Sequence, residues 1–165
     1  MIPATRLVIC GTTLLTLAQS CRLFADDNNK YSRESLAGIA SLGVVVEELP
    51  TPATKLGLTK EAIQTDVELK LRLAGMEVDS TNHAQYLYVE VNVLAANNRS
   101  NAVNIHVEMA QAVTLHRDAA ILTTAATWSI SELATNVYTA QDIRDLIKDQ
   151  VDRFLNAWLS VNPKR

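Results

Sequence analysis

Alternation of apolar and polar side chains is the feature of this 165-residue sequence that most restricts its fold. The alternation runs through residues 86–94 and again through 103–115, and a less regular version covers 122–130. A period of two puts apolar side chains on one face of a β-sheet and polar side chains on the other. The sequence therefore predicts a three-strand antiparallel meander with one buried face.

The parity of each run predicts which of its side chains face the core. Gln111 is the one polar side chain that breaks this parity in the second run. Turn-forming residues separate the strands at 97–101 and around Asp118. The side chains expected to face inward are Leu87, Val89, Val91, Val93, Val103, Ile105, Val107, Met109, Val113, Leu115, Leu122, Ala126, Trp128 and Ile130.

Two helices are predicted to cover the buried face. Residues 59–74 alternate like a strand, but they are mostly strong helix formers, with Thr59 placed to cap a helix and Gly75 placed to end it. We therefore interpret this segment as a helix. The second helix, capped by Thr139 and Asp142, has an apolar stripe with steps of three and four. Its members are Ile143, Leu146, Ile147, Val151, Phe154, Leu155, Trp158 and Leu159.

The order of the elements defines the expected fold. Residues 36–49 end in a β-branched run that predicts a buried strand, and Pro50 and Pro52 are expected to stop it and begin a short linker. Residues 76–78 predict a short strand. The order β-α-β-β-β-β-α indicates an α+β two-layer sandwich, with a mainly antiparallel sheet and two helices packed on one face. This single domain is expected to span residues 36–165, after a loose polar segment at 26–35.

The first 25 residues are typical of an export signal. Arg6 supplies the positive charge, an uncharged apolar run follows over residues 7–18, and small residues allow cleavage after Ser20 or after Ala25. The apolar run is shorter than the roughly 20 residues that a membrane-spanning helix needs. We therefore expect a periplasmic or extracellular protein with no membrane span.

Both cysteines of the chain, Cys10 and Cys21, lie in this leader. Cleavage after Ala25 would leave the mature domain without a disulfide, a thiolate metal site or a cysteine nucleophile. Alternatively, Cys21 is a lipid attachment site, although Leu17 lies one position too early for a good lipoprotein signal.

Motifs for catalysis are absent from the sequence. It contains no G-x-S-x-G, no glycine-rich phosphate loop, no H-E-x-x-H and no calcium-loop pattern. Asp145, Asp149 and Asp152 alternate with basic residues, which is typical of a solvated helix face. The formal charge of -3 argues against nucleic acid as a partner. We expect no catalytic residues, no cofactor, no metal site and therefore no enzyme.

The three histidines provide little for a metal site. His106 and His116 are separated by roughly 34 Å of extended strand, and His83 lies in a polar turn. His106 and Glu108 share one strand face, which Glu90 of the paired strand could join to hold a divalent ion weakly. We favour a solvated polar face instead.

The polar face of the meander is the candidate partner surface. Aromatic and titratable side chains gather there, and such a half-polar face can bind a partner. Its members are Tyr86, Tyr88, Glu90, His106 and Glu108. Separately, Asn98 begins an N-glycosylation acceptor sequence at the expected hairpin tip.

Several short strings resemble a family of small exported bacterial proteins with no assigned activity. The resemblance implies a shared fold and export, and it supplies no catalytic residues. The strings are LAGMEV at 73–78, YLYVEV at 86–91, QAVTLHR at 111–117, TW at 127–128 and DRFLNAWLSVNP at 152–163.

Three classes of function are consistent with these observations. The favoured class is a non-catalytic exported binding or scaffold domain, whose partner is an unknown protein or an envelope component. The alternative is a lipid-anchored component of an envelope assembly, with Cys21 as the lipidation site. The third is an enzyme whose active site the sequence does not identify.

Overall fold

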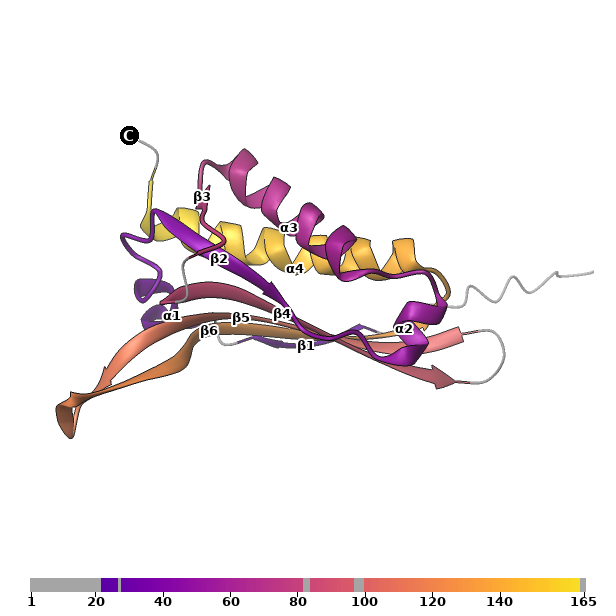
Figure 1. Cartoon of the computed structure of the whole chain (residues 1–165), viewed down its shortest axis with the longest axis horizontal. Coiled ribbons are helices and arrows are strands. Elements are labelled where there is room, and N and C mark those ends of the chain that lie inside the picture. The colour runs from indigo at the N-terminus through magenta and orange to yellow at the C-terminus, as the bar shows by residue number, and fades with distance from the viewer. Residues whose placement is uncertain (1–21, 27, 82–83, 97–99, 164–165) are drawn as a thin grey trace, which may run out of the picture.

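The computed structural model describes residues 22–26, 28–81, 84–96 and 100–163 (Figure 1). These residues form two layers, a curved sheet and a pair of long helices that lie across one of its faces. The predicted α+β architecture, a mainly antiparallel sheet with two helices on one face, is confirmed.

The sheet has the spatial order β1-β6-β5-β4-β2-β3. β4, β5 and β6 are the predicted meander and pair antiparallel, whereas β2 runs parallel to β4 and to the two-residue β3. A parallel pair needs a crossover connection, which the helix between β2 and β4 provides. The strands are β1 (Arg22–Asp26), β2 (Ser41–Val46), β3 (Glu77–Val78), β4 (Gln85–Ala96), β5 (Ser100–Leu115) and β6 (Asp118–Val137).

The crossover helix α3 (Lys60–Ala74) begins and ends as its sequence predicts. The Thr59 hydroxyl accepts a hydrogen bond from the backbone N–H of Ala62 at 3.2 Å. At the other end Gly75 has φ 94°, a left-handed conformation that closes the helix. The segment is thus a helix despite its strand-like alternation. Its buried residues, Ile63, Val67 and Leu71, are four apart and form one stripe along the helix.

The last helix, α4 (Ala140–Val161), covers β5 and β6 (Figure 1). A capping box fixes its first turn: Asp142 N–H donates to Thr139 Oγ1 at 3.1 Å, and Thr139 N–H donates to Asp142 Oδ2 at 2.9 Å. The predicted apolar stripe is buried against the sheet, except for Leu159, which is partly buried.

Both tryptophans lie in the core, as predicted. Trp128 of β6 is 1% exposed and meets Phe154 of α4 edge to face, with ring centroids 5.3 Å apart. Trp158 packs at the end of α4, and its Nε1–H donates to the carbonyl of Ile39 at 2.9 Å. The closing helix is therefore joined to the sheet and to the connection before β2.

The N-terminal part of the chain differs from the sequence prediction. The segment expected to be loose contains helix α1 (Lys30–Glu34), whose first turn is capped by Asn29. The expected linker after β2 contains helix α2 (Thr51–Lys55), in which Pro52 occupies the first turn and needs no N–H partner. Furthermore, β1 lies within the predicted leader and pairs with β6.

The hairpin of β5 and β6 extends beyond the end of α4 (Figure 1). A register shift lies between Met109 and Ala110, where β6 contains one residue more than β5. Beyond it Leu122 pairs with Thr114 and Ala126 with Ala110, so both lie on the face opposite to Trp128, and the prediction of the core is wrong for this part of the meander. Val113 and Leu115 keep the inward parity, but α4 does not reach them (Figure 1). The positions predicted to face inward that are partly or fully exposed are Val113, Leu115, Leu122 and Ala126.

Candidate binding surface

The five residues of the predicted partner surface lie together on the sheet face turned away from α3 and α4, which we call the open face. Tyr88 is paired across the strands with Glu108, and Glu90 with His106. Directly opposed residues of an antiparallel pair project to the same side. Tyr86 has the same parity at the start of β4. The structure thus places all five together, and their role as a partner surface stays a prediction.

His106 is held by hydrogen bonds from both sides of its ring. Its Nδ1 lies 2.6 Å from Ser131 Oγ on β6, and its Nε2 lies 3.1 Å from Glu108 Oε2. The imidazole side chain is 24% exposed. Because both ring nitrogens have partners, the ring has a fixed orientation on the open face.

Tyr88 is anchored to a carboxylate from the neighbouring parallel strand. A hydrogen bond to Glu47, just after β2, is the main cause that raises the pKa of Tyr88 to about 12. Partial burial and the charges of Glu47, Glu90 and Glu108 act in the same direction. Tyr88 therefore remains a neutral hydrogen-bond donor at physiological pH.

Three carboxylates gather on the open face around Tyr88, from Glu47, Glu90 and Glu108. Glu108 also contacts His106, and Asn92 Nδ2 donates to Glu90 Oε1 at 2.7 Å. These contacts fix the acceptor oxygens before any partner arrives. Such an array can bind cationic or donor-rich groups.

Sequence reasoning missed two members of this surface, Glu47 and Ser131. Glu47 joins it only because β2 runs parallel beside β4, and Val46 pairs with Val89. No local sequence pattern predicts that β2 pairs with β4. Ser131 has the outward parity of the third strand, and a count of parity beyond Ile130 would have placed it opposite His106.

Ser131, His106 and Glu108 form a chain of hydrogen bonds that has the order nucleophile, base and carboxylate. Acyl transfer also needs N–H donors aimed at the developing oxyanion. Here His106 and Ser131 are paired residues of adjacent strands, whose backbone groups belong to the sheet ladder. The two hydrogen bonds hold the imidazole ring in one orientation.

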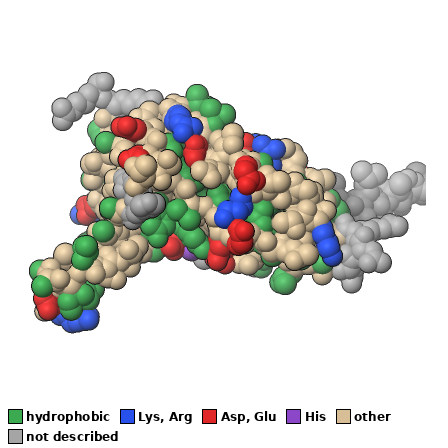
Figure 2. Space-filling view, viewed as in Figure 1, with side chains coloured by type: hydrophobic (Ala, Val, Ile, Leu, Met, Phe, Trp, Pro, Cys, Tyr) green, Lys and Arg blue, Asp and Glu red, His purple; other side chains and the backbone are tan. Residues whose placement is uncertain are grey.

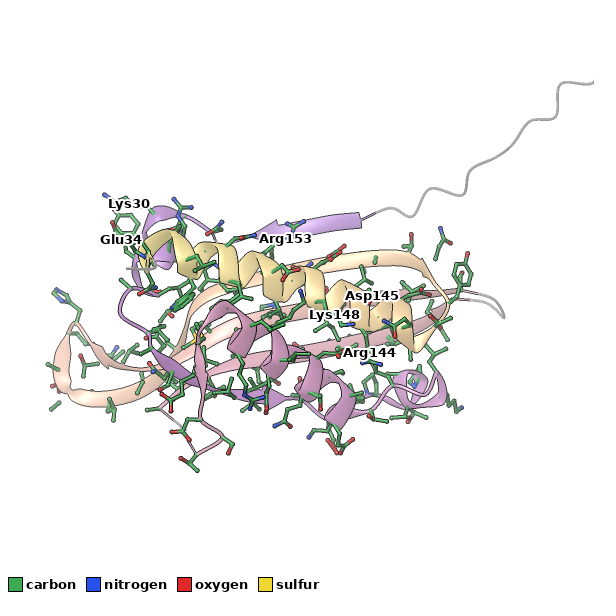
Figure 3. All side chains as sticks on the ribbon, turned by 90° about the horizontal axis from the view of Figure 1, so that it is seen from above. Lys30, Glu34, Arg144, Asp145, Lys148 and Arg153 are labelled. Carbon is green, nitrogen blue, oxygen red and sulfur yellow. The ribbon has the colours of Figure 1, made fainter. Side chains whose placement is uncertain are left out.

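The two long helices lie side by side on the opposite side of the molecule (Figure 3), and ion pairs connect them. Arg144 of α4 donates to both carboxylate oxygens of Asp66 of α3, at 2.7 and 2.9 Å. This hydrogen bonding holds the pKa of Asp66 below its ordinary value, and the Lys148 and Arg144 charges assist while partial burial opposes. Lys70 also contacts Asp152 at 2.5 Å. The helix face predicted to be solvated therefore contains contacts between helices.

A polar pair lies in the core, which the sequence reasoning did not foresee. Glu132 of β6 and Gln150 of α4 are 1% and 0% exposed. Gln150 Nε2 donates to Glu132 Oε2. Glu132 continues the inward parity of Trp128 and Ile130, which was the available signal. The pair is enclosed between β6 and α4.

A shallow hollow of about 320 Å³ lies where α2 meets α3. Its lining includes Leu58, Thr59 and the exposed ion pair of Lys60 with Glu48, at 2.8 Å. Within the described ranges, no group of three or more His, Cys, Asp or Glu side chains is arranged to hold a metal ion. Nor does any helix in those ranges have the length and apolar character to cross a membrane.

Some sequence predictions fall outside the described residues. They concern the residues at Ser20 and Cys21, the turn histidine His83 and the glycosylation acceptor Asn98. His116 is described and lies at the tip of the β5–β6 hairpin, where it is exposed and remote from His106.

Comparisons with known proteins identify fold relatives only. No family model and no curated protein matches the sequence. Among solved structures, the chain is similar to PelC from Paraburkholderia phytofirmans, crystallised as a dodecamer, with 11% identity and a TM-score of 0.43 over 85% of this chain and 97% of that one. It is also similar to a minor lipoprotein from Acinetobacter baumannii, with 13% identity and a TM-score of 0.38 over 73% and 90% of the two chains. The family suggested by the short strings stays a prediction.

Proposed function

We propose that the protein is an exported, non-catalytic binding domain that holds a partner on its open face. The observation that carries the proposal is the fixed set of carboxylates around Tyr88 and His106 on an uncovered sheet face. Side chains already ordered by their neighbours lose little conformational entropy when a partner binds. The leader sequence supports export to the periplasm or the cell exterior.

The charges of the open face define the chemistry of its partner. Glu47, Glu90 and Glu108 supply acceptors, while the cluster contains neither lysine nor arginine. A protein or envelope component that presents Lys or Arg side chains is complementary to it. The rings of Tyr86 and Tyr88 add contact area at low entropic cost.

Affinity purification of the exported protein from its own host tests this proposal. The double variant Glu90→Gln, Glu108→Gln removes two charges from the open face and preserves side-chain shape. Its matched control is Glu61→Gln, an exposed carboxylate on α3. We expect the wild-type protein and the control to retain the same partner, and the double variant to lose it. Equal recovery by all three proteins would contradict binding at the open face.

A second candidate is a lipid-anchored component of an envelope assembly. β1 is consistent with it, because Arg22–Asp26 pairs with residues 130–134 of β6 and a chain that begins at Cys21 keeps this strand. Cleavage after Ala25 would remove most of this strand and leave that edge of β6 without its partner. If the leader is cleaved, the whole of β1 is kept only when the cleavage lies before Arg22, as it does when Cys21 is the first residue.

The mass of the mature N-terminal peptide distinguishes the two candidates. A peptide that begins at Cys21 with an attached acyl chain supports the anchored form, and one that begins there without a lipid supports the free form. A mature chain that begins at Asp26 would show that β1 is dispensable and would remove the support for the anchored form.

A further inference from the structure

The outer part of the β5–β6 hairpin, residues 111–126, projects from the body as an arm. At its base Gln111 donates to the carbonyl of Ser35 at the end of α1, and beyond that contact the arm extends past α4 and α1 (Figure 1). Every side chain from His116 to Thr124 is exposed. Leu122 is 70% and Ile121 41% exposed. The arm thus presents apolar side chains that the fold of one chain does not use.

The charged side chains of the arm lie only at its tip. Between Ala110 and Ile130 the charged residues are Arg117 and Asp118 alone. Figure 2 shows the same distribution, with hydrophobic side chains along the arm and charged ones at its end. Solvent-exposed strands ordinarily carry charges that prevent association. The composition of this arm is that of a buried contact.

The edges of the arm are open as well. β4 pairs with β5 only as far as Gln111, and β1 pairs with β6 only from Ile130 onward. In the described part of the chain no further strand pairs with the outer edges of residues 113–115 or 118–126. An open strand edge is a template for pairing with another chain.

From these observations we propose that the arm is a self-association element, and that a second copy of this chain covers it. The arm provides about 16 of the 20–30 residues that a standard interface uses on each side. A second copy supplies a matching uncharged surface and open edge by symmetry. Arg117 and Asp118 are also complementary to themselves across a two-fold axis that brings the two tips together.

Charge favours a second copy over a bilayer as the occupant. A bilayer would have to accept Arg117 and Asp118, which lie at the leading end of the arm. The chain as a whole has a formal charge of -3, so two copies repel where carboxylates meet, and the uncharged arm allows them to approach without that repulsion. This inference does not depend on partner binding at the open face.

Sedimentation velocity of the mature protein over a range of concentrations tests the proposal. The variant Leu122→Glu puts a charge on an exposed position of the arm, so it leaves the core intact. We expect the wild-type protein to dimerise or to form a higher symmetric assembly, and the variant to raise the dissociation constant at least tenfold. Thr124→Lys, on the same face of the arm, is expected to have the same effect. Leu73→Glu is the matched control, because Leu73 is 75% exposed on α3, away from the arm.

The outcomes separate the possible occupants. Loss of association in both arm variants but not in Leu73→Glu supports the proposal. A wild-type protein that stays monomeric overturns it, and co-sedimentation with phosphatidylglycerol vesicles that depends on Leu122 would then identify a bilayer instead. Association that is unchanged by both arm variants also overturns it.

Discussion

At the scale of single residues, Trp158 connects the last helix to the chain before β2. Its ring is buried, and Nε1–H is hydrogen-bonded to the carbonyl of Ile39. We expect Trp158→Ala to lower the free energy of unfolding by roughly 3–5 kcal/mol, the range for emptying a large aromatic site. Urea denaturation measures this loss. Asn156→Ala, at an exposed position of the same helix, is expected to change stability by less than about 0.5 kcal/mol.

The buried pair of Glu132 and Gln150 leads to a prediction of non-additivity. Gln150→Leu takes an amide donor away from a buried carboxyl group and should cost about 1–3 kcal/mol. Replacing both residues by Leu removes the polar groups together, so the double variant should be more stable than the sum of the two single losses predicts. Urea unfolding of the four proteins in the cycle measures the coupling. Strictly additive losses would mean that the two side chains do not act as a pair.

Asp66 makes the stability of the helix pair dependent on acid. Its hydrogen bonds from Arg144 lower its pKa in the folded chain, so the folded chain binds fewer protons there than the unfolded chain. The contact therefore contributes stability above the ordinary value of 3.8, and this contribution is lost as the pH falls through the lower folded-state pKa.

We accordingly expect Asp66→Asn to have a lower free energy of unfolding than the wild-type protein at neutral pH. The difference between the two free energies should become smaller as the pH falls below about 4. Urea unfolding over a pH series provides the measurement. Asp145→Asn is the control, since the Asp145 side chain is 61% exposed, with an ion pair to Lys148 and a hydrogen bond from Gln141. If the difference in the free energy of unfolding between Asp66→Asn and the wild-type protein stayed constant through the acid range, the ion pair could not be the cause of that difference.

At the scale of elements, α4 closes the core. Its stripe packs Phe154 against Trp128, and nine of its residues are buried. Each large apolar side chain contributes about 1.5–3 kcal/mol on burial, while a whole domain is stable by only about 5–15 kcal/mol. A chain that ends at Thr139 is therefore expected to be unfolded or aggregated. Circular dichroism and thermal melting test this, and cooperative melting with near-native stability would instead make α4 a detachable helix.

Elements with strong local signals could be predicted from the sequence, and the others could not. The ends of α3 at Thr59 and Gly75 and the capping box of α4 are local, so both helices were predictable. α1 depends on a single Asn cap within a polar segment, and α2 begins at a Pro-rich stretch that suggests a stop. In the arm the sequence keeps its alternation, but the register shift between Met109 and Ala110 reverses the parity of β6, and α4 ends before it could cover Val113 and Leu115.

The candidate surface shows the same limit. Four of its five predicted residues pair within the β4–β5 hairpin, Tyr88 with Glu108 and Glu90 with His106, so parity and turn position were enough to bring them together. Glu47 comes from a strand that lies beside β4 only after the α3 crossover. No local sequence pattern predicts that Glu47 lies beside Tyr88, and the hydrogen bond to Glu47 is the main cause of the raised pKa of Tyr88.

At the scale of the whole molecule, the two faces of the sheet have different surroundings. α3 and α4 stabilise one side of the sheet through a packed core, and the other side is left with a fixed polar cluster. The arm extends from the end of the same sheet. Because we propose different surfaces for partner binding and for self-association, variants at Trp158, Glu108 and Leu122 are expected to affect different measurements.

Site-specific photo-crosslinking in the exported protein tests the central claim, binding at the open face, most directly. A photoreactive side chain at Asn104, which shares the parity of His106, is compared with one at Leu69 on the exposed side of α3. We predict a specific adduct from position 104 and none from position 69. Its yield should decrease as added salt screens the carboxylates. Equal labelling at both positions, or no adduct at position 104, would contradict the account.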